Sequence, residues 1–334
     1  MPVRALCTLL AILTASVAGC GSGESNAKRC NGSKAACDKP LNEVVFPATH
    51  NSFAASDEPG WRFADQRYGI ARQLEDGIRG FLIDVHFGVR DSAKGIVRTD
   101  LRAEGADRNK VAQAIGPEAL HAADRIAGRI GAHPVQGTST PYLCHTLCEL
   151  GAEPLDQELD VIKRFMDKHR NQVLIVIVED YVPPATVERA FEHAGLLPQV
   201  ATFKPGATLP TLGTLINRGQ RLVVFAEEKG GVPTWYMPAF TYIQDTPLGA
   251  RRPSQLSCSL YRGNPDSPIL MLNHWLALFP PVRAAERVIG TAPALRRRIA
   301  ECTRERGRGP GIVAVDFYEQ TAVVRVARTL NAQR

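Results

Sequence analysis

Short apolar runs recur along the chain, and polar or ionisable residues follow nearly every one. The runs cover residues 41–45, 80–85, 141–144, 173–178, 222–226, 268–272 and 312–315. Apolar stretches of this length, bounded by turn signals, are typical of strands that are buried on both faces. We therefore expect seven strands, with an eighth within 240–244.

Between these runs the apolar positions follow a helical spacing. Such patterns cover residues 68–77, 117–131, 155–169, 186–197, 211–218 and 292–306. Strands that alternate with helices predict βα units and a parallel sheet. The predicted fold class is α/β, a TIM-like (β/α) barrel that is either complete or distorted and incomplete. Residues 88–140 are too many for a simple connection and predict an insertion over the mouth of the barrel.

Candidate functional residues lie directly after the apolar runs. In chain order they are His50, Asn51, Asp84, His86, His145, Glu179, Asn273, His274, Trp275 and Asp316. Polar groups at the carboxyl ends of strands are the layout of a TIM-barrel active site. Each residue also has an ordinary structural interpretation, as a core histidine, a carboxylate that fixes a loop, or a side chain that packs at the barrel rim.

Composition narrows the class of protein. The chain has 334 residues, of which 44% are hydrophobic and 22% charged, and its net charge is +6. This is an ordinary globular composition, and residues 41–334 are predicted to form a single domain. No long basic block is present, and Arg296–Arg298 fit the solvated face of a helix, so we expect no nucleic-acid partner.

The N-terminus predicts export. Arg4 is followed by an apolar stretch that is too short to span a bilayer, which is typical of a signal peptide over residues 1–19. The sequence Val-Ala-Gly-Cys ending at Cys20 resembles a bacterial lipobox, in which the cysteine is acylated. Residues 20–40 would then form a tether and an N-terminal disulfide segment. We expect a membrane-anchored lipoprotein of the cell envelope; an ordinary cleaved signal is the alternative.

Six cysteines remain after Cys7 and Cys20, and an even number in an exported chain indicates disulfides. Six cysteines allow about 15 connectivities. Proximity in the sequence favours Cys30–Cys37 and Cys144–Cys148, which leaves Cys258–Cys302. A zinc site built from Cys144, His145 and Cys148 is a rival, but it lacks a convincing second pair of ligands.

Several blocks, taken together and in order, resemble the phosphatidylinositol-specific phospholipase C X-domain superfamily. They are Ala48–Phe53, Gln73-Leu74, Gly77–Arg79, Leu82–Asp84, Leu143–His145 and Val176–Asp180. Leu143–Cys148, Asn273–Trp275 and Val315–Tyr318 look most like the secreted, disulfide-containing branch of phospholipase C-like phosphodiesterases. Any one block is weak evidence, whereas the combined order is strong.

The resemblance implies a TIM-like barrel that cleaves a phosphodiester by acid–base catalysis. In that family the inositol 2-hydroxyl attacks phosphorus and expels diacylglycerol. His50 matches the histidine on the nucleophile side, and His145 matches the one on the leaving-group side. Two imidazoles with pKa values near working pH can share proton removal and donation. Asp316 is expected to orient His50. Asn273, His274 and Trp275 are candidates for binding the head group.

Metal dependence is left open by the resemblance. Metal-independent bacterial members carry an arginine phosphate clamp where this chain has His86. Calcium-dependent members use one asparagine and three acids, and Asn51, Asp84 and Glu179 fit three of those places. Oxygen ligands of this kind suit Ca²⁺ or Mg²⁺. The chain therefore either binds such a cation or works without a cofactor, with His86 near the phosphate or at the barrel rim.

The leading hypothesis is thus an exported, membrane-tethered phosphodiesterase of the phospholipase C type, whose partners are a phospholipid or other phosphodiester and the membrane. A glycerophosphodiester or sphingomyelin phosphodiesterase is the second hypothesis, although such barrels favour paired acids around a metal. A non-catalytic binding lipoprotein on the same barrel is the third, and the two intact histidines argue against it.

Overall fold

The computed structural model describes residues 29–132 and 136–333, so the predicted signal peptide and the candidate lipidation site at Cys20 lie outside the described residues. The strands are β1 Phe46–Thr49, β2 Gly80–Asp91, β3 Ile96–Thr99, β4 Thr140–Leu143, β5 Glu153–Pro154, β6 Leu174–Asp180, β7 Val200–Ala201, β8 Leu222–Ala226, β9 Met237–Pro238, β10 Ile243–Asp245, β11 Ile269–Asn273 and β12 Pro310–Val315. The helices are α1 Ile70–Asp76, α2 Arg108–Ile115, α3 Pro117–Arg129, α4 Leu155–Lys168, α5 Pro184–His193, α6 Leu212–Asn217, α7 Ala239–Tyr242, α8 Arg283–Ile289, α9 Ala292–Arg306 and α10 Val323–Ala332.

Parallel strands curl into an open barrel in the order β10-β11-β12-β1-β2-β6-β8. The two short strands β7 and β9 share the next position, because β7 pairs with the start of β8 and β9 with its end. Strand pairing does not continue from this position to β10 within the described sheet, so the barrel is incomplete there. The expected TIM-like α/β class, with an incomplete barrel, is confirmed, and the expected eighth strand corresponds to β10.

Two of the expected strands were placed wrongly. Residues 41–45 contain a 3₁₀ turn, Leu41–Glu43, and the strand that leads to His50 is Phe46–Thr49 instead. Residues 140–143 do form a strand, but β4 runs antiparallel to the far end of β2 and is not part of the barrel. Apolar content alone cannot distinguish these cases, since strand direction depends on the partner strand.

The strands are buried on both faces because alternate side chains enter two different cores. On β1 and β12, Phe46, Ala48, Ile312 and Ala314 belong to an inner core that also contains Cys30, Ala36 and Leu212. The intervening residues Val313 and Val315 pack in an outer core with side chains of the surrounding helices. If this every-second-residue pattern is extended past the carboxyl end of a strand, the next residue on the inner side faces the mouth of the barrel.

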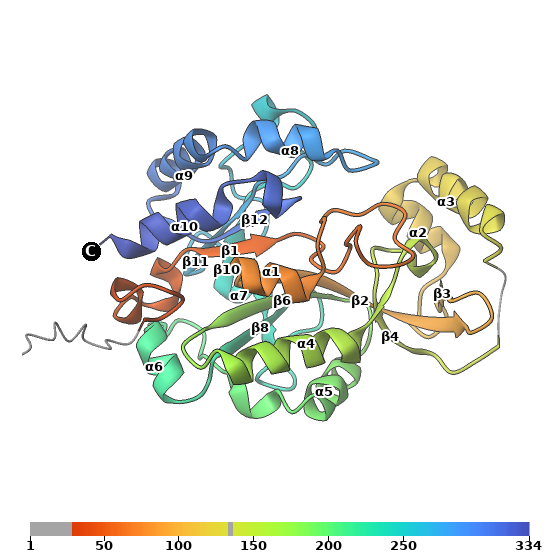
Figure 1. Cartoon of the computed structure of the whole chain (residues 1–334), viewed down its shortest axis with the longest axis horizontal. Coiled ribbons are helices and arrows are strands. Elements are labelled where there is room, and N and C mark those ends of the chain that lie inside the picture. The colour runs from red at the N-terminus through yellow and green to blue at the C-terminus, as the bar shows by residue number, and fades with distance from the viewer. Residues whose placement is uncertain (1–28, 133–135, 334) are drawn as a thin grey trace, which may run out of the picture.

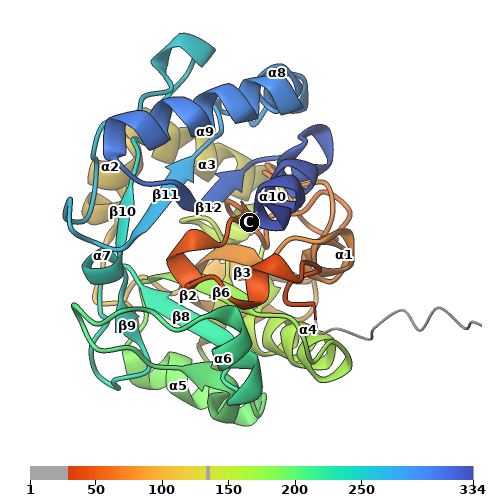
Figure 2. The same ribbon diagram turned by 90° about the vertical axis from the view of Figure 1, so that its left-hand side faces the viewer.

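Helices surround the barrel, while the insertion projects from one end of it (Figure 1). Figure 2 views the molecule from the opposite end, with the C-terminus in front and α2 and α3 behind the strands. The insertion comprises the extension of β2, the antiparallel strand β3, and the helices α2 and α3. It lies beyond the carboxyl ends of the barrel strands, as expected for a segment next to the mouth.

Three disulfides are present: Cys30–Cys37, Cys144–Cys148 and Cys258–Cys302. These are the pairs that proximity in the sequence favours, and with both sulfurs bonded Cys144 and Cys148 cannot act as zinc thiolates. Among the described residues, no helix is both long and apolar enough to cross a membrane.

Candidate active site

His50 follows β1 and continues the inner alternation of Phe46 and Ala48. Its amide donates to the carbonyl of Val315, and its carbonyl accepts from the side chain of Gln66. The imidazole Nδ1 lies 2.9 Å from Asp316 Oδ1 and donates to it. The ring stacks on the indole of Trp275, with centroids 4.1 Å apart and an interplanar angle of 4°. Since Trp275 covers one ring face and Asp316 holds Nδ1, Nε2 is the ring nitrogen available to a substrate.

Burial controls the protonation of this pair. It lowers the pKa of His50, although nearby acids, Asp65 first among them, oppose the effect. Burial, assisted by the Asp65 carboxyl, raises the pKa of Asp316. A neutral His50 is therefore favoured near neutral pH, which is the form a general base requires.

Asp65 is a site residue that the sequence analysis missed. It is 6% exposed, and its Oδ2 accepts a 2.9 Å hydrogen bond from the side-chain amide of Asn51. His50, Asp65 and Asp316 each place one possible metal-ligand atom within 4.8 Å of the others. A cation bound among them would compete with Asp316 for His50 Nδ1, so we interpret Asp316 as the residue that orients His50, and Asp65 as a neighbouring acid held by Asn51.

His145 reaches the same region from β4. Leu143, the last residue of β4, lies opposite Val85, and the amide of Cys144 donates to the carbonyl of Asp84. His145 is exposed on one side, while the surrounding protein lowers the pKa of its ring and the nearby imidazole of His50 lowers it further. The two histidines are therefore close enough to interact electrostatically, and the Cys144–Cys148 disulfide flanks the loop between them and the insertion.

Three carboxylates form an acidic wall beside His50. Asp84 lies near the end of the part of β2 that pairs with β6, Glu179 lies near the end of β6, and Glu227 follows β8. Asp84 and Glu179 are register partners on neighbouring strands. All three line one small cavity with His50 and Trp275. Burial raises the pKa of Asp84, and the charges of Glu179 and Glu227 raise it further. Burial also raises the pKa of Glu227 to about 7, although Arg262 partly offsets this.

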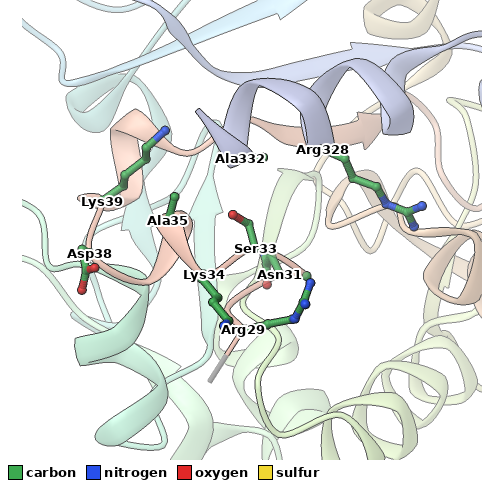
Figure 3. A pocket seen from close by; sticks show the side chains of 10 residues that line it. Arg29, Asn31, Ser33, Lys34, Ala35, Asp38, Lys39, Arg328 and Ala332 are labelled. Atoms are coloured by element: carbon green, nitrogen blue, oxygen red, sulfur yellow. The ribbon is translucent and has the colours of Figure 1, made fainter. Parts of the chain in front are cut away.

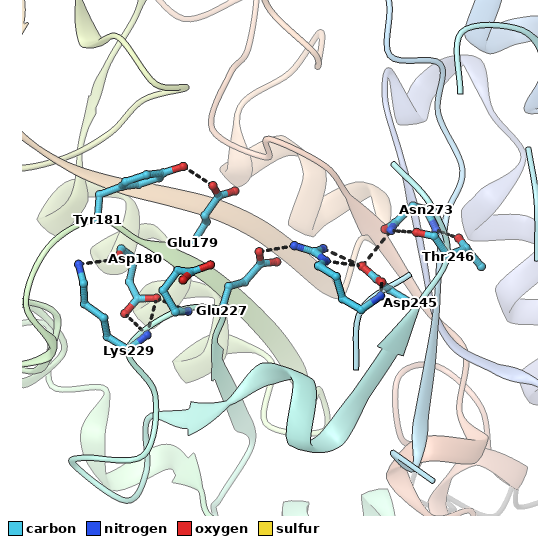
Figure 4. Close-up of polar contacts among 10 residues, drawn as sticks. Glu179, Asp180, Tyr181, Glu227, Lys229, Asp245, Thr246 and Asn273 are labelled. Carbon is cyan, nitrogen blue, oxygen red and sulfur yellow. Dashed lines mark hydrogen bonds and ion pairs between the residues drawn. The ribbon is translucent and has the colours of Figure 1, made fainter. Parts of the chain in front are cut away.

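Arg262 supplies the positive charge of this cavity and was also missed from the sequence. Its guanidinium lies 2.6 Å from Glu227 Oε2 and 2.7 Å from Asp245 Oδ2. Figure 4 shows these two carboxylates, and the side-chain amide of Asn273 donates to the same Asp245 oxygen that Arg262 binds. Because Glu227 follows β8 and Asp245 ends β10, the arginine bridges the gap at which the barrel is open.

His86 is held at the rim by the insertion. It is 2% exposed, its Nδ1 lies 3.0 Å from Glu104 Oε1, and its ring stacks on Tyr181 with centroids 4.0 Å apart. The hydroxyl of Tyr181 donates in turn to Glu179 (Figure 4). The nearby ring of His86 also contributes to lowering the pKa of His145. The insertion thus fixes an imidazole, hydrogen-bonded to the Glu104 carboxylate, at the place where the family resemblance expects an arginine.

A family model described as PI-PLC X 1 matches residues 132–331, which is more than half of the chain. The chain belongs to the PI-PLC X-domain family. The match includes His145, Glu179 and Asp316, which the structure gathers near His50.

Curated relatives in the PI-PLC X-domain family are distant. PI-PLC X domain-containing protein 1 of Arthroderma benhamiae is 27% identical over 211 residues, which are 57% of this chain and 68% of that protein. PI-PLC X domain-containing protein At5g67130 of Arabidopsis thaliana is 22% identical over 306 residues. That match covers 84% of this chain but only 59% of the Arabidopsis protein.

One solved structure, the phosphatidylinositol-specific phospholipase C of Staphylococcus aureus, superposes with a TM-score of 0.51 at 14% identity. The superposition covers 91% of this chain and 98% of that one. At this identity the likeness shows the fold of the PI-PLC X-domain family alone, and any activity has to be argued from the site.

The three candidates for binding the head group, Asn273, His274 and Trp275, point alternately to the inner and the outer side of the barrel wall. Asn273 has the inner orientation, but its amide donates to Asp245 and to the carbonyl of Thr246, so it supports Arg262 indirectly. His274 has the outer orientation, and its Nε2 bonds the carbonyl of Ile289 instead of facing the cavity. Burial lowers the pKa of His274 to about 4, consistent with a neutral core histidine. Trp275 is the member of this block that contacts the site.

For a divalent cation, Asp84 and Glu179 have suitable oxygens on adjacent strands. The pKa of Asp84 is raised by burial first and by the neighbouring carboxylates second, and a bound cation would oppose both effects. Asn51 is not among the residues that line the cavity with Asp84 and Glu179, and its amide nitrogen is held by Asp65. The donor set therefore fits a cation held mainly by Asp84 and Glu179, with a carboxylate contribution from Glu227.

Proposed function

We propose that the protein is an exported, membrane-tethered phosphodiesterase of the phospholipase C type that cleaves a phosphoinositide-like lipid with two histidines. The observation that carries this proposal is the hydrogen bond between His50, which follows the carboxyl end of β1, and Asp316. His50 lies near His145 and lines a cavity that also contains Arg262. Membership of the PI-PLC X-domain family supports the same chemistry.

The proposed reaction begins when neutral His50 removes a proton from the attacking hydroxyl. The hydroxyl oxygen forms a bond to phosphorus, and the bond from phosphorus to the leaving-group oxygen breaks. The reactive form is the one in which His145 is protonated, although its surroundings lower its pKa, and it donates its proton to that oxygen, so both protons are accounted for. The two histidines finish in opposite protonation states, and a second proton transfer through water or product restores them.

Exposed apolar side chains around the mouth support a lipid substrate. In loops that follow strand ends, Val232 is 80% exposed, Tyr261 55% and Phe279 65%. Phe279 packs against Phe63, with ring centroids 4.6 Å apart, so the two sides of the mouth share an aromatic contact. Exposed apolar side chains beside a polar site are a feature of proteins that engage lipids or protein partners.

The acidic wall leaves one competing substrate class. Paired acids around a metal would also serve a glycerophosphodiester or sphingomyelin phosphodiesterase, and Asp84 with Glu179 could provide such a pair. Incubation of the purified protein with phosphatidylinositol, sphingomyelin and water-soluble glycerophosphodiesters, each assayed for released phosphate esters, distinguishes these substrates. Turnover of none of them would contradict the enzymatic proposal and favour a binding lipoprotein.

The same panel tests the metal. A cation held by Asp84 and Glu179 would supply charge neutralisation for the phosphate when bound. We expect activity to fall in excess chelator and to return with Ca²⁺ or Mg²⁺, and Asp84→Asn should weaken both the cation response and the rate. Full activity in chelator would instead assign charge neutralisation to Arg262 and to His86 alone.

Arg262→Gln should lower kcat/KM about 10²-fold, because fixed charges aimed at a developing anion contribute on this scale. Arg262→Lys should restore only part of the rate, since lysine cannot bridge two carboxylates as a planar fork does. Arg252→Gln, in the same loop but on an exposed side chain, is the matched control. A folded Arg262→Gln protein with an unchanged rate would show that the arginine only joins β8 to β10.

A further inference from the structure

A cationic hollow lies at the end of the barrel that is remote from the active site. It has a volume of about 810 Å³ and opens beside the 3₁₀ turn η1 (Ala35–Cys37) and helix α10. Four of the side chains that line it are basic: Arg29, Lys34, Lys39 and Arg328. Figure 3 shows them with Asp38, the one acidic side chain of the lining.

The position of the hollow follows from the strands. Its lining residue Asn31 exchanges hydrogen bonds with the backbone of Val173, immediately before β6 begins. Glu179 of the acidic wall lies near the other end of β6, six residues later. At about 3.3 Å per residue, the two sites are separated by roughly 20 Å along one strand. In Figures 1 and 2 the hollow's helix, α10, lies at the C-terminal end of the molecule, opposite α2 and α3.

The cations of the hollow are held in a fixed frame and remain available. The Cys30–Cys37 disulfide closes the segment, and the Ser33 hydroxyl donates to the carbonyl of Asn331 at 3.0 Å. Within the part of the chain that the structure describes, none of the four basic side chains forms an ion pair. A concave group of unpaired cations concentrates positive potential and attracts polyvalent anionic surfaces.

We propose that this hollow binds the anionic headgroups of the bilayer to which the N-terminus is tethered. Cys20 precedes Arg29 by nine positions. A fully extended chain of that length reaches at most about 30 Å, so an acylated Cys20 would keep the hollow close to the bilayer surface. One acyl anchor gains stability from a second, electrostatic contact of this kind. A barrel held in this way points its mouth away from the anchoring bilayer, so the lipid substrate of the proposed function would reach the site from elsewhere than that bilayer.

Vesicle binding tests the hollow directly. The full chain carrying Cys20→Ala, which excludes any acyl contribution, should bind phosphatidylcholine vesicles that contain phosphatidylglycerol and should lose binding as salt is raised. Lys34→Gln with Arg328→Gln should lower the partition coefficient about 30-fold, from about 1 kcal/mol for each cation near an anionic surface. Arg296→Gln with Arg297→Gln removes the same charge from exposed positions on α9 and should have little effect.

Hydrogen exchange on the vesicle-bound protein tests the orientation. We expect protection of the amides in 29–39 and 323–333, with the mouth loops 229–236 and 276–282 unchanged. Equal loss of binding in the two double variants, or protection at the mouth loops alone, would overturn the inference. The headgroup-binding proposal rests on the proposed N-terminal tether and does not depend on which substrate the active site cleaves. Hydrolysis of a water-soluble phosphodiester should be unchanged in the Lys34 and Arg328 variant, so failure of the catalytic proposal would be seen separately.

Discussion

Replacing His50 with alanine should lower kcat/KM roughly 10²–10⁴-fold, the usual range for a general acid or base. His145→Ala should have an effect of the same order, because each histidine handles one proton of the same reaction. Asp316→Asn should cost less than the loss of His50, since the imidazole remains but its orientation and charge support are weakened. The measurement is initial rate against concentration for the substrate that the panel identifies.

The control for these variants is His193→Ala, an exposed histidine at the end of α5 that should leave the rate unchanged. The pH profile adds an independent readout. Because burial lowers the pKa of His50 below 6.5, the acidic limb of kcat/KM should lie below that of a free imidazole, with activity rising as His50 loses its proton. His50→Ala should abolish that limb. A rate that survives in both histidine variants would contradict acid–base catalysis by this pair.

The predictable part of the site follows from one periodicity. On each barrel strand alternate residues enter the inner core, and His50, Asp84, Glu179 and Asp316 all continue the inner series. Such residues converge at the mouth because parallel strands end at the same edge. The same count places His274 and Asp180 on the outer face, where His274 bonds the Ile289 carbonyl and Asp180 bonds the Lys229 amide. Counting alternation would have excluded His274 from the head-group candidates.

The unpredicted residues share a different origin. Asp65, Glu104 and Arg262 lie in loops, where no periodicity fixes which side chain faces the site. Their positions depend on contacts across the fold: Asp65 with Asn51, Glu104 with His86, and Arg262 with both Glu227 and Asp245. The two-residue strands β7 and β9 are also too short to carry a sequence signal. Local pattern therefore locates strand-end chemistry but not the loops that complete it.

Loss of the Cys258–Cys302 disulfide should lower the free energy of unfolding by about 4 kcal/mol, from the loop-closure entropy of a crosslink across 44 residues. The bond joins the loop before Arg262 to the buried side of α9. Both of its cysteines pack in the outer core. Cys258→Ala with Cys302→Ala should lower the urea midpoint and raise the m-value, because the unfolded chain becomes less compact.

The matched comparison is the Cys144–Cys148 disulfide, which closes a separation of only four residues. Chain entropy predicts a cost about 2 kcal/mol smaller for its removal. This bond flanks His145, however, so Cys144→Ala with Cys148→Ala should reduce kcat by freeing the loop that positions the proposed acid. The long bridge should therefore affect unfolding most and the short bridge turnover most. Equal effects of both removals on the two measurements would contradict separate structural and positioning roles for these disulfides.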